Sequence, residues 1–309
     1  DDSNAPRTPL ATASPIKGRL LLVEDNPVNL LVAQRLISLT GMQCDTAENG
    51  EQALEKLARG HYDIVLMDCQ MPVMDGYTAT RKWREHEEES QLQPMPIIAM
   101  TANAMAGDRQ KCLDAGMDDY LSKPVAREHL ENTLRRWLDG PSRSRRGLAQ
   151  TTQTTTAPAL EPTAMPASFA ATAPVQTAAM AAPTEATKPI APPPAQHAVP
   201  ALDSEIIEEL WSAMGDQFKQ LVDVFLDDAP GHLTKLEAAA VVGDIAGMAG
   251  PAHALKSSSA NLGALQVSAA AKHIEHGARD RTLADAVGAV AALSHEYHRA
   301  EIELRVLLH

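Results

Sequence analysis

The stretch RLLLVEDNPVNLLVAQRLISLTG (19–41) decides the fold of the first part of the chain. Its apolar run at 19–24 has strand character, a helical stretch follows at 27–39, and Gly41 stands where that helix should stop. The alternation repeats, with strand-like runs at 43–47, 64–68, 96–101 and 119–122 and helical stretches at 50–59, 76–87, 105–115 and 126–138. Five strands alternating with five helices predict an α/β domain at 17–139, with a doubly wound parallel sheet covered on both faces.

The last third of the chain, residues 201–309, shows no such alternation. Helical stretches are expected at about 204–214, 216–240, 244–260, 264–279 and 282–308, and Leu221, Phe225 and Leu226 have the spacing of one buried stripe. A small all-α antiparallel bundle is the natural product of such helices. Between the two domains, residues 141–200 hold eleven of the 21 prolines, so 140–200 is expected to be a disordered linker, and 1–16 a second disordered tether.

Composition narrows the classes of function. The 309 residues carry a net charge of −13, which argues against nonspecific binding to nucleic acid or to anionic membranes. Segment 17–139 has 14 basic and 20 acidic residues, and segment 201–309 has 8 and 16. The three scattered cysteines indicate a reducing compartment. No apolar run reaches the length of a membrane span and no signal peptide is evident, so a cytoplasmic chain is expected.

Polar side chains gather where the predicted strands end. Glu24 and Asp25 end the first strand, Asp68 the third and Thr101 the fourth, and Lys123 follows the fifth. The carboxyl ends of parallel strands lie side by side, and ligands bind there. Three crowded carboxylates repel one another unless a cation neutralises them, and Mg²⁺ suits oxygen ligands and phosphoryl groups. Lys123 and the Thr101 hydroxyl could then hold phosphoryl oxygens.

Four motifs in this segment, VEDN (23–26), MDCQMPVMDG (67–76), MTANAM (100–105) and DYLSKP (119–124), resemble the signature of the flavodoxin-like receiver domains of two-component signalling. The resemblance implies that Asp68 takes a phosphoryl group from a phosphohistidine to form a mixed acyl phosphate. The other roles it implies are Mg²⁺ ligation by Glu24, Asp25, Asp68 and the backbone carbonyl of Gln70, switching by Thr101 and Tyr120, and phosphoryl binding by Lys123 before a cis bond to Pro124.

One histidine, in the helical segment, stands out from the eleven histidines of the chain. His253 lies in AHALKSSSANLGA (252–264), where Lys256 and Ser257 share its helix face at i+3 and i+4. Small neighbours let another protein approach the imidazole, and the lysine could hold phosphoryl oxygens. The stretch resembles histidine phosphotransfer (HPt) domains, which implies that His253 is phosphorylated with Lys256 as its partner. Ser257 stands where that family often has Gly, and Pro251 predicts that the helix of His253 is bent or starts late.

Other candidate sites have simpler explanations. The pairs His273 and His276, and His295 and His298, have an i, i+3 spacing that can bind zinc, but surface histidines are favoured because no Cys or clustered acidic ligand lies near them in sequence. Cys69 follows Asp68, and a small apolar residue at a strand end is favoured over a redox role.

The helix at 27–39 carries two apolar stripes, of which only one can face the sheet. Leu30, Ala33 and Ile37 form the stripe that we expect to be exposed to a helical partner, and charge reversal at Leu30 or Ile37 should then slow transfer. The other stripe consists of Val28, Val32, Leu36 and Leu39.

A receiver and an HPt domain together predict a phosphorelay from a donor histidine to Asp68, to His253 and on to a downstream response regulator. No Gly-rich nucleotide lid is present, so the chain is not expected to phosphorylate itself from ATP. Because it starts at Asp1, the favoured interpretation is the cytoplasmic tail of a tripartite bacterial hybrid sensor histidine kinase, whose kinase core lies upstream and could be anchored in the inner membrane. The alternative is a stand-alone adaptor whose phosphorylation controls binding, and a non-relay scaffold is a distant third.

Overall fold

The computed structural model describes residues 15–101, 106–139 and 200–308, with only the backbone described for 106–108. Most of the predicted tether and nearly all of the predicted linker lie outside the described residues. Ile16 was assigned to the tether, yet it is 2% exposed and its N–H donates to the Thr40 carbonyl at 2.9 Å. The packed part of the first domain therefore includes Ile16, because its side chain completes the core below the first strand.

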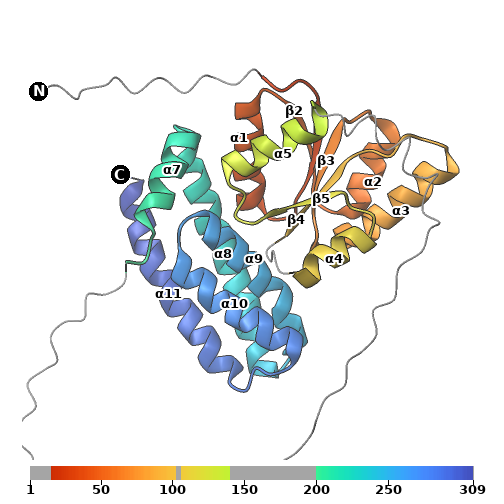
Figure 1. The fold of residues 1–309 in the computed structure, drawn as a ribbon. Helices are drawn as coiled ribbons and strands as arrows, with labels where there is room; N and C mark the ends of the chain where they lie inside the picture. Colours follow the sequence, from red (N-terminus) through yellow and green to blue (C-terminus); the bar gives the residue numbers. More distant parts are fainter. Residues whose placement is uncertain (1–14, 102–105, 140–199, 309) are drawn as a thin grey trace, which may run out of the picture. The chain divides into compact units, whose positions relative to one another are not determined.

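The first domain is built on a five-stranded parallel sheet in the order β2-β1-β3-β4-β5 (Figure 1). Asp68 pairs with Met100 across β3 and β4, and Thr101 pairs with Ser122 across β4 and β5. The register therefore brings the carboxyl ends of the central strands to one edge. The strands are β1 (Arg19–Val23), β2 (Gln43–Ala47), β3 (Ile64–Asp68), β4 (Ile97–Thr101) and β5 (Asp119–Ser122).

Four helices connect these strands and a fifth follows the last strand, each close to its predicted range. The Asn26 side chain caps the first of them by accepting the N–H groups of Val28 and Asn29, and Gly41 ends it at φ 88°. Asn49 caps the second helix through the N–H of Gln52. The helices are α1 (Pro27–Thr40), α2 (Gly50–Arg59), α3 (Gly76–Glu89), α4 (Ala106–Asp114) and α5 (Arg127–Leu138).

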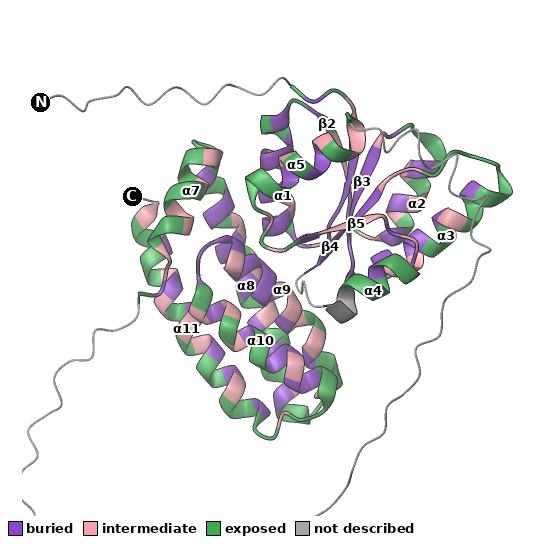
Figure 2. Cartoon of the chain, in the orientation of Figure 1, coloured by how far each residue is buried: buried purple, intermediate pink, exposed green. Residues whose placement is uncertain are grey.

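The sheet is buried on both faces, as the predicted α/β fold requires (Figure 2). Alternate strand residues point to opposite faces. Leu20 and Leu22 belong to the core beneath α1 and α5, whereas Leu21 and Val23 belong to the core beneath α2, α3 and α4. The central strands β1, β3 and β4 are nearly continuous apolar runs for this reason, whereas the edge strands β2 and β5 are partly polar and less buried.

The second domain is all-helical, as predicted. Its core is formed by fully buried side chains of four long helices, among them Phe218, Leu221 and Phe225 of α8, Leu255 of α9, Ile274 of α10, and Leu293 and Leu304 of α11. The helices are α7 (Ser204–Met214), α8 (Gln217–Val242), α9 (Ala249–Asn261), α10 (Leu265–Asp280) and α11 (Ala286–Leu307).

The helix of His253 starts later than the predicted 244–260. A 3-10 turn (Ala246–Met248) precedes α9, which places Pro251 in the first turn of the helix. A proline is tolerated there because the first N–H groups of a helix have no intrahelical acceptor. The described residues of both domains fall into one compact unit. Among the described helices, none combines the length and the apolar composition needed to cross a bilayer.

Candidate functional site

The acidic residues predicted at the strand ends meet at the carboxyl edge of the sheet. One carboxylate oxygen from each of Glu24, Asp25 and Asp68 lies within 4.8 Å of the others. The Lys123 ammonium lies 2.5 Å from Glu24 Oε2 and 2.7 Å from Asp68 Oδ2. One lysine charge balances only part of three carboxylates, so the donor set fits a divalent cation with oxygen ligands.

The electrostatics of this cluster support the same conclusion. Glu24 is 1% exposed, and burial, reinforced by the charge of Asp68, raises its pKa to about 7 despite the Lys123 ammonium. Burial and Asp68 also raise the pKa of Asp25. Burial alone would lower the pKa of Lys123, but the charges of Asp68 and Glu24 outweigh it and raise that pKa. A bound cation would relieve the repulsion that these shifts express.

The remaining predicted residues of this site surround the cluster. Thr101 ends β4 and is 6% exposed, and its carbonyl accepts the N–H of Lys123 at 2.7 Å. The N–H of Gln70 donates to Asp68 Oδ1 at 3.2 Å. Tyr120 is half-buried on β5, where it packs against the core beneath α2, α3 and α4. The peptide bond between Lys123 and Pro124 is cis.

His253 projects from α9 and is held by a carboxylate that the sequence argument missed. Its Nδ1 lies 2.6 Å from Oε1 of Glu275 on α10, and the Lys256 ammonium donates to Oε2 of the same residue. Arg279 also pairs with Glu275, at 2.6 Å. An ionised carboxylate at Nδ1 keeps the proton on that nitrogen, so the lone pair of the neutral ring lies on Nε2.

Burial and hydrogen bonding shift the pKa values in the cluster around His253 in opposite directions. Glu275 is fully buried, which by itself would raise its pKa, but hydrogen bonds from His253 and Lys256 outweigh burial and lower the pKa to about 2. Burial, together with the charges of Arg279 and Lys272, lowers the pKa of Lys256 despite its pairing with Glu275. Glu275 is therefore an anion at neutral pH.

The position of Glu275 in the sequence could have identified it as a candidate buried acid. It falls within the buried stripe of α10, four residues after Ala271 and three before Ala278. An acid in the apolar stripe of a helix needs a partner, because burying an unpaired charge is costly. Arg279 lies on the same helix, but His253 and Lys256 lie on α9, so the sequence could not name these two partners.

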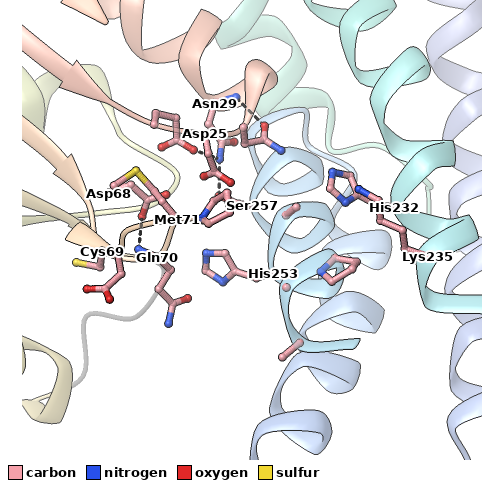
Figure 3. A pocket seen from close by; sticks show the side chains of 18 of the residues that line it. Asp25, Asn29, Asp68, Cys69, Gln70, Met71, His232, Lys235, His253 and Ser257 are labelled. Atoms are coloured by element: carbon pink, nitrogen blue, oxygen red, sulfur yellow. Dashed lines mark hydrogen bonds between the residues drawn. The ribbon is translucent and has the colours of Figure 1, made fainter. Parts of the chain in front are cut away.

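Asp68 and His253 line the same cleft, whose volume is about 630 Å³ (Figure 3). The receiver-type domain contributes Asp25, Asp68 and Gln70, and the helical domain contributes His253 and Arg279. In Figure 3 the His253 ring points from its helix into the cleft, on the side of Asp68 and Gln70.

The docking stripe predicted for α1 is wrong, because the opposite stripe faces the helical domain. Val32 and Leu36 line a hollow of about 290 Å³ together with Leu210 and Ala213 of α7. Ile37, one residue further, is fully buried with Ala33 in the core. Successive helix residues are 100° apart, so a shift of one position changes the face.

Cys69 and Cys112 are both buried, with their sulfur atoms 3.8 Å apart. The hydrogen bond between the two thiols and their burial raise the pKa of Cys69. A thiol held in its neutral form suits the predicted packing role at the strand end.

Comparison with known proteins agrees with this geometry. The family model described as the response regulator receiver domain matches residues 20–135, and the model described as the Hpt domain matches residues 220–303. A solved receiver domain of a sensor histidine kinase from Pseudomonas aeruginosa, with a magnesium ion coordinated in its active-site cleft, is 46% identical. That match covers 40% of this chain and 99% of that one, with a TM-score of 0.37.

Two curated relatives are sensor histidine kinases. GacS of Pseudomonas protegens is 39% identical over 142 residues, which cover 44% of this chain and 16% of the relative. RcsC of Escherichia coli is 42% identical over 147 residues, which cover 47% of this chain and 15% of the relative. The chain thus spans about one sixth of the length of these relatives. Residues 20–135 are therefore a receiver domain and residues 220–303 an Hpt domain, and the chain belongs to the proteins of two-component phosphorelay signalling.

Proposed function

We propose that Asp68 accepts a phosphoryl group from a phosphohistidine and passes it to His253, which passes it on to a downstream response regulator. The observation that carries the proposal is that the Asp68 carboxylate and the His253 imidazole line one cleft. The alternative of an adaptor without onward transfer would not need a histidine with an activating carboxylate in that cleft.

In the first step, an oxygen of Asp68 attacks phosphorus while the phosphorus–nitrogen bond of the donor breaks. Mg²⁺ would be held by Glu24, Asp25, Asp68 and the Gln70 backbone carbonyl, and it would offset the repulsion between the two anions. Lys123 and the Thr101 hydroxyl take the phosphoryl oxygens, and Tyr120 responds to the new position of Thr101. The close contact of Lys123 with Asp68 supports its part.

In the second step, Nε2 of His253 attacks the same phosphorus and the bond to the Asp68 oxygen breaks. The imidazole gains positive charge as the bond forms, and the Glu275 carboxylate at Nδ1 stabilises that charge. Lys256, one helical turn from His253, would donate hydrogen bonds to the phosphoryl oxygens as they arrive. The Lys256 ammonium and the Glu275 carboxylate lie together at the Nδ1 edge of the ring, which leaves the Nε2 edge open for the attack.

The proposal also includes the domain bounds, the phosphoryl donor and acceptor, and the type of parent protein. The domain bounds proposed are 17–139 and 201–309, extended at the first by Ile16, with a linker between them. The upstream donor is a histidine kinase core, in the same parent chain or in trans, and the acceptor of His253 is the receiver domain of a response regulator. Matches to sensor histidine kinases support a parent of that type, anchored in a membrane by parts other than these domains.

The test is labelling of the whole chain with a small acyl-phosphate donor and Mg²⁺. The wild type should carry hydroxylamine-sensitive label on Asp68 and alkali-stable label on His253. His253→Ala should keep only the first, and Asp68→Ala should lose both. Label on His253 in the Asp68→Ala variant would overturn the order of transfer.

A further inference from the structure

The polar side chain at the centre of the contact between the two domains is Asn29 of α1. Its Nδ2 donates to Glu24 Oε1 at 2.8 Å and to Ser257 Oγ at 2.9 Å, and its Oδ1 accepts from Asn261 Nδ2 at 2.7 Å. Each of Asn29, Ser257 and Asn261 is 7% exposed or less. Both N–H groups and the carbonyl of the Asn29 amide are therefore occupied, away from water.

This cluster is connected to the surroundings of both reacting groups. Glu24 belongs to the acidic cluster of Asp68, and Ser257 stands one helical turn after His253 on the same face of α9. Figure 3 shows Asn29 and Ser257 at the edge of the cleft, with their hydrogen bond drawn. A displacement of α9 against α1 that broke this bond would also move His253 away from Asp68.

In the described part of the chain, Arg35 and Arg279 also form hydrogen bonds across the domains, and these bonds are less selective for a particular partner residue. Arg35 donates to the backbone carbonyl of Ala213 at 2.7 Å, a group that every residue type offers. Arg279 donates to Gln70 Oε1 at 2.7 Å, but the Arg279 side chain is 39% exposed, so water can replace this partner. The Asn29 cluster differs because side chains on both domains must match and all three residues are buried.

We propose that Asn29 is a specificity-determining residue that selects this chain's own HPt domain as the partner of its receiver domain, through the Ser257 hydroxyl and the Asn261 amide. The proposal rests on the proposed transfer from Asp68 to His253 and names the partner of that step. An HPt domain without these two groups would leave a buried donor or acceptor of Asn29 unpaired, which is the effective means of rejecting a wrong partner. Ser257, the departure from the glycine common at this position, supplies the hydroxyl.

The experiment measures transfer between whole chains, because covalent linkage would mask a weakened contact. The donor chain carries His253→Ala and is phosphorylated on Asp68 with acetyl phosphate and Mg²⁺. The acceptor chain carries Asp68→Ala. Asn29→Ala is added to the donor and Ser257→Ala to the acceptor, singly and together, and the second-order rate constant of His253 labelling is followed.

Each single substitution should lower the rate constant about tenfold, and the pair should lower it little further, because both remove the same bond. The matched control is Ser258→Ala in the acceptor, since the Ser258 hydroxyl bonds only to carbonyls of its own helix among the described residues. It should leave the rate within about twofold of the parent pair. The extent of Asp68 labelling in the Asn29→Ala donor separates slow phosphorylation from slow transfer.

The two proposals fail in different ways. Suppose that the parent pair transfers label normally. If the two substitutions then change the rate constant by less than twofold, or if their separate effects multiply to about a hundredfold, the proposed role of Asn29 is refuted. The proposed relay from Asp68 to His253 is not affected by either result. If the parent pair itself does not transfer label to His253, the proposed function fails first. Thermal unfolding of each variant shows whether a lower rate reflects an unfolded domain.

Discussion

At the scale of single residues, Glu275 decides the chemistry available to His253. It is fully buried, and hydrogen bonds from His253 and Lys256 make it an anion in spite of that burial. A buried carboxylate with two donors fixes the ring, selects its tautomer and offsets the charge that forms on phosphorylation. In the proposed transfer Glu275 acts through His253 and not on the phosphoryl group, which makes it a positioning residue.

We expect Glu275→Gln to slow labelling of His253 at least about tenfold while leaving labelling of Asp68 unchanged, because an amide supplies neither the charge nor a defined tautomer. The measurement is the rate of alkali-stable label on the whole chain with acyl phosphate and Mg²⁺. Glu301→Gln, which removes an acid paired with the exposed Arg305, is the control. Equal rates in Glu275→Gln and the wild type would contradict the role.

Glu275 should also give stability a pH dependence with a definite sign. Its pKa is lowered from 4.5 to about 2 in the folded chain, so the stabilisation is complete above about pH 4.5. As the pH falls from 4.5 towards 2, the unfolded chain takes up a proton that the folded chain does not, and stability is lost. Urea midpoints at pH 6, 4 and 3 should therefore fall less steeply for Glu275→Gln than for the wild type. Parallel curves would show that the Glu275 interactions contribute nothing to folding.

At the scale of elements, α1 shows how one helix serves two surfaces. Leu36 lines the hollow shared with α7, whereas Ile37 is fully buried in the core. The two side chains differ by 100° around the helix axis, so Leu36 can contribute to docking while Ile37 contributes to the folding of the receiver domain. The helix is apolar on both sides for this reason, and its two stripes look alike in the sequence.

We expect Leu36→Glu and Ile37→Glu to differ in kind. Leu36→Glu should slow transfer between whole chains about tenfold or more, with Asp68 labelling retained, because a charge in the hollow opposes docking. Ile37→Glu should destabilise the receiver domain by about 3–5 kcal/mol and reduce Asp68 labelling with it. Urea unfolding followed by circular dichroism distinguishes the two variants. If Leu36→Glu unfolded the domain and Ile37→Glu only slowed transfer, the stripe of Leu30, Ala33 and Ile37 would be the docking surface, as first expected from the sequence.

At the scale of the whole molecule, two acidic domains meet, among the described residues, through hydrogen bonds to neutral acceptors. Residues 17–139 and 201–309 each carry an excess of acidic residues. The cross-domain hydrogen bonds of the described residues involve the amides of Asn29 and Asn261, the Ser257 hydroxyl, and two arginines that bond to neutral oxygens. Charge therefore opposes the approach of the domains, and local complementarity of polar and apolar groups holds them together.

Raising the salt concentration should for this reason speed transfer between separate chains. Between 50 and 300 mM salt, the second-order rate constant for His253 labelling should rise about twofold, because screening weakens the repulsion of like charges. An interface built from opposite charges would instead slow as salt is added. A clear fall in the rate constant would show that ion pairs dominate the contact.

The sequence by itself determined the two fold classes and the acidic cluster, because period-two and period-3.6 patterns and the ends of strands are local features that a parallel sheet brings together in a known way. It also indicated His253, because Lys256 and Ser257 share its turn. Only the tertiary structure decided which stripe of α1 faces a partner, that Glu275 holds the imidazole, and that Asn29 bonds across the domains. Those contacts join residues far apart in the chain, and packing rather than local pattern selects them.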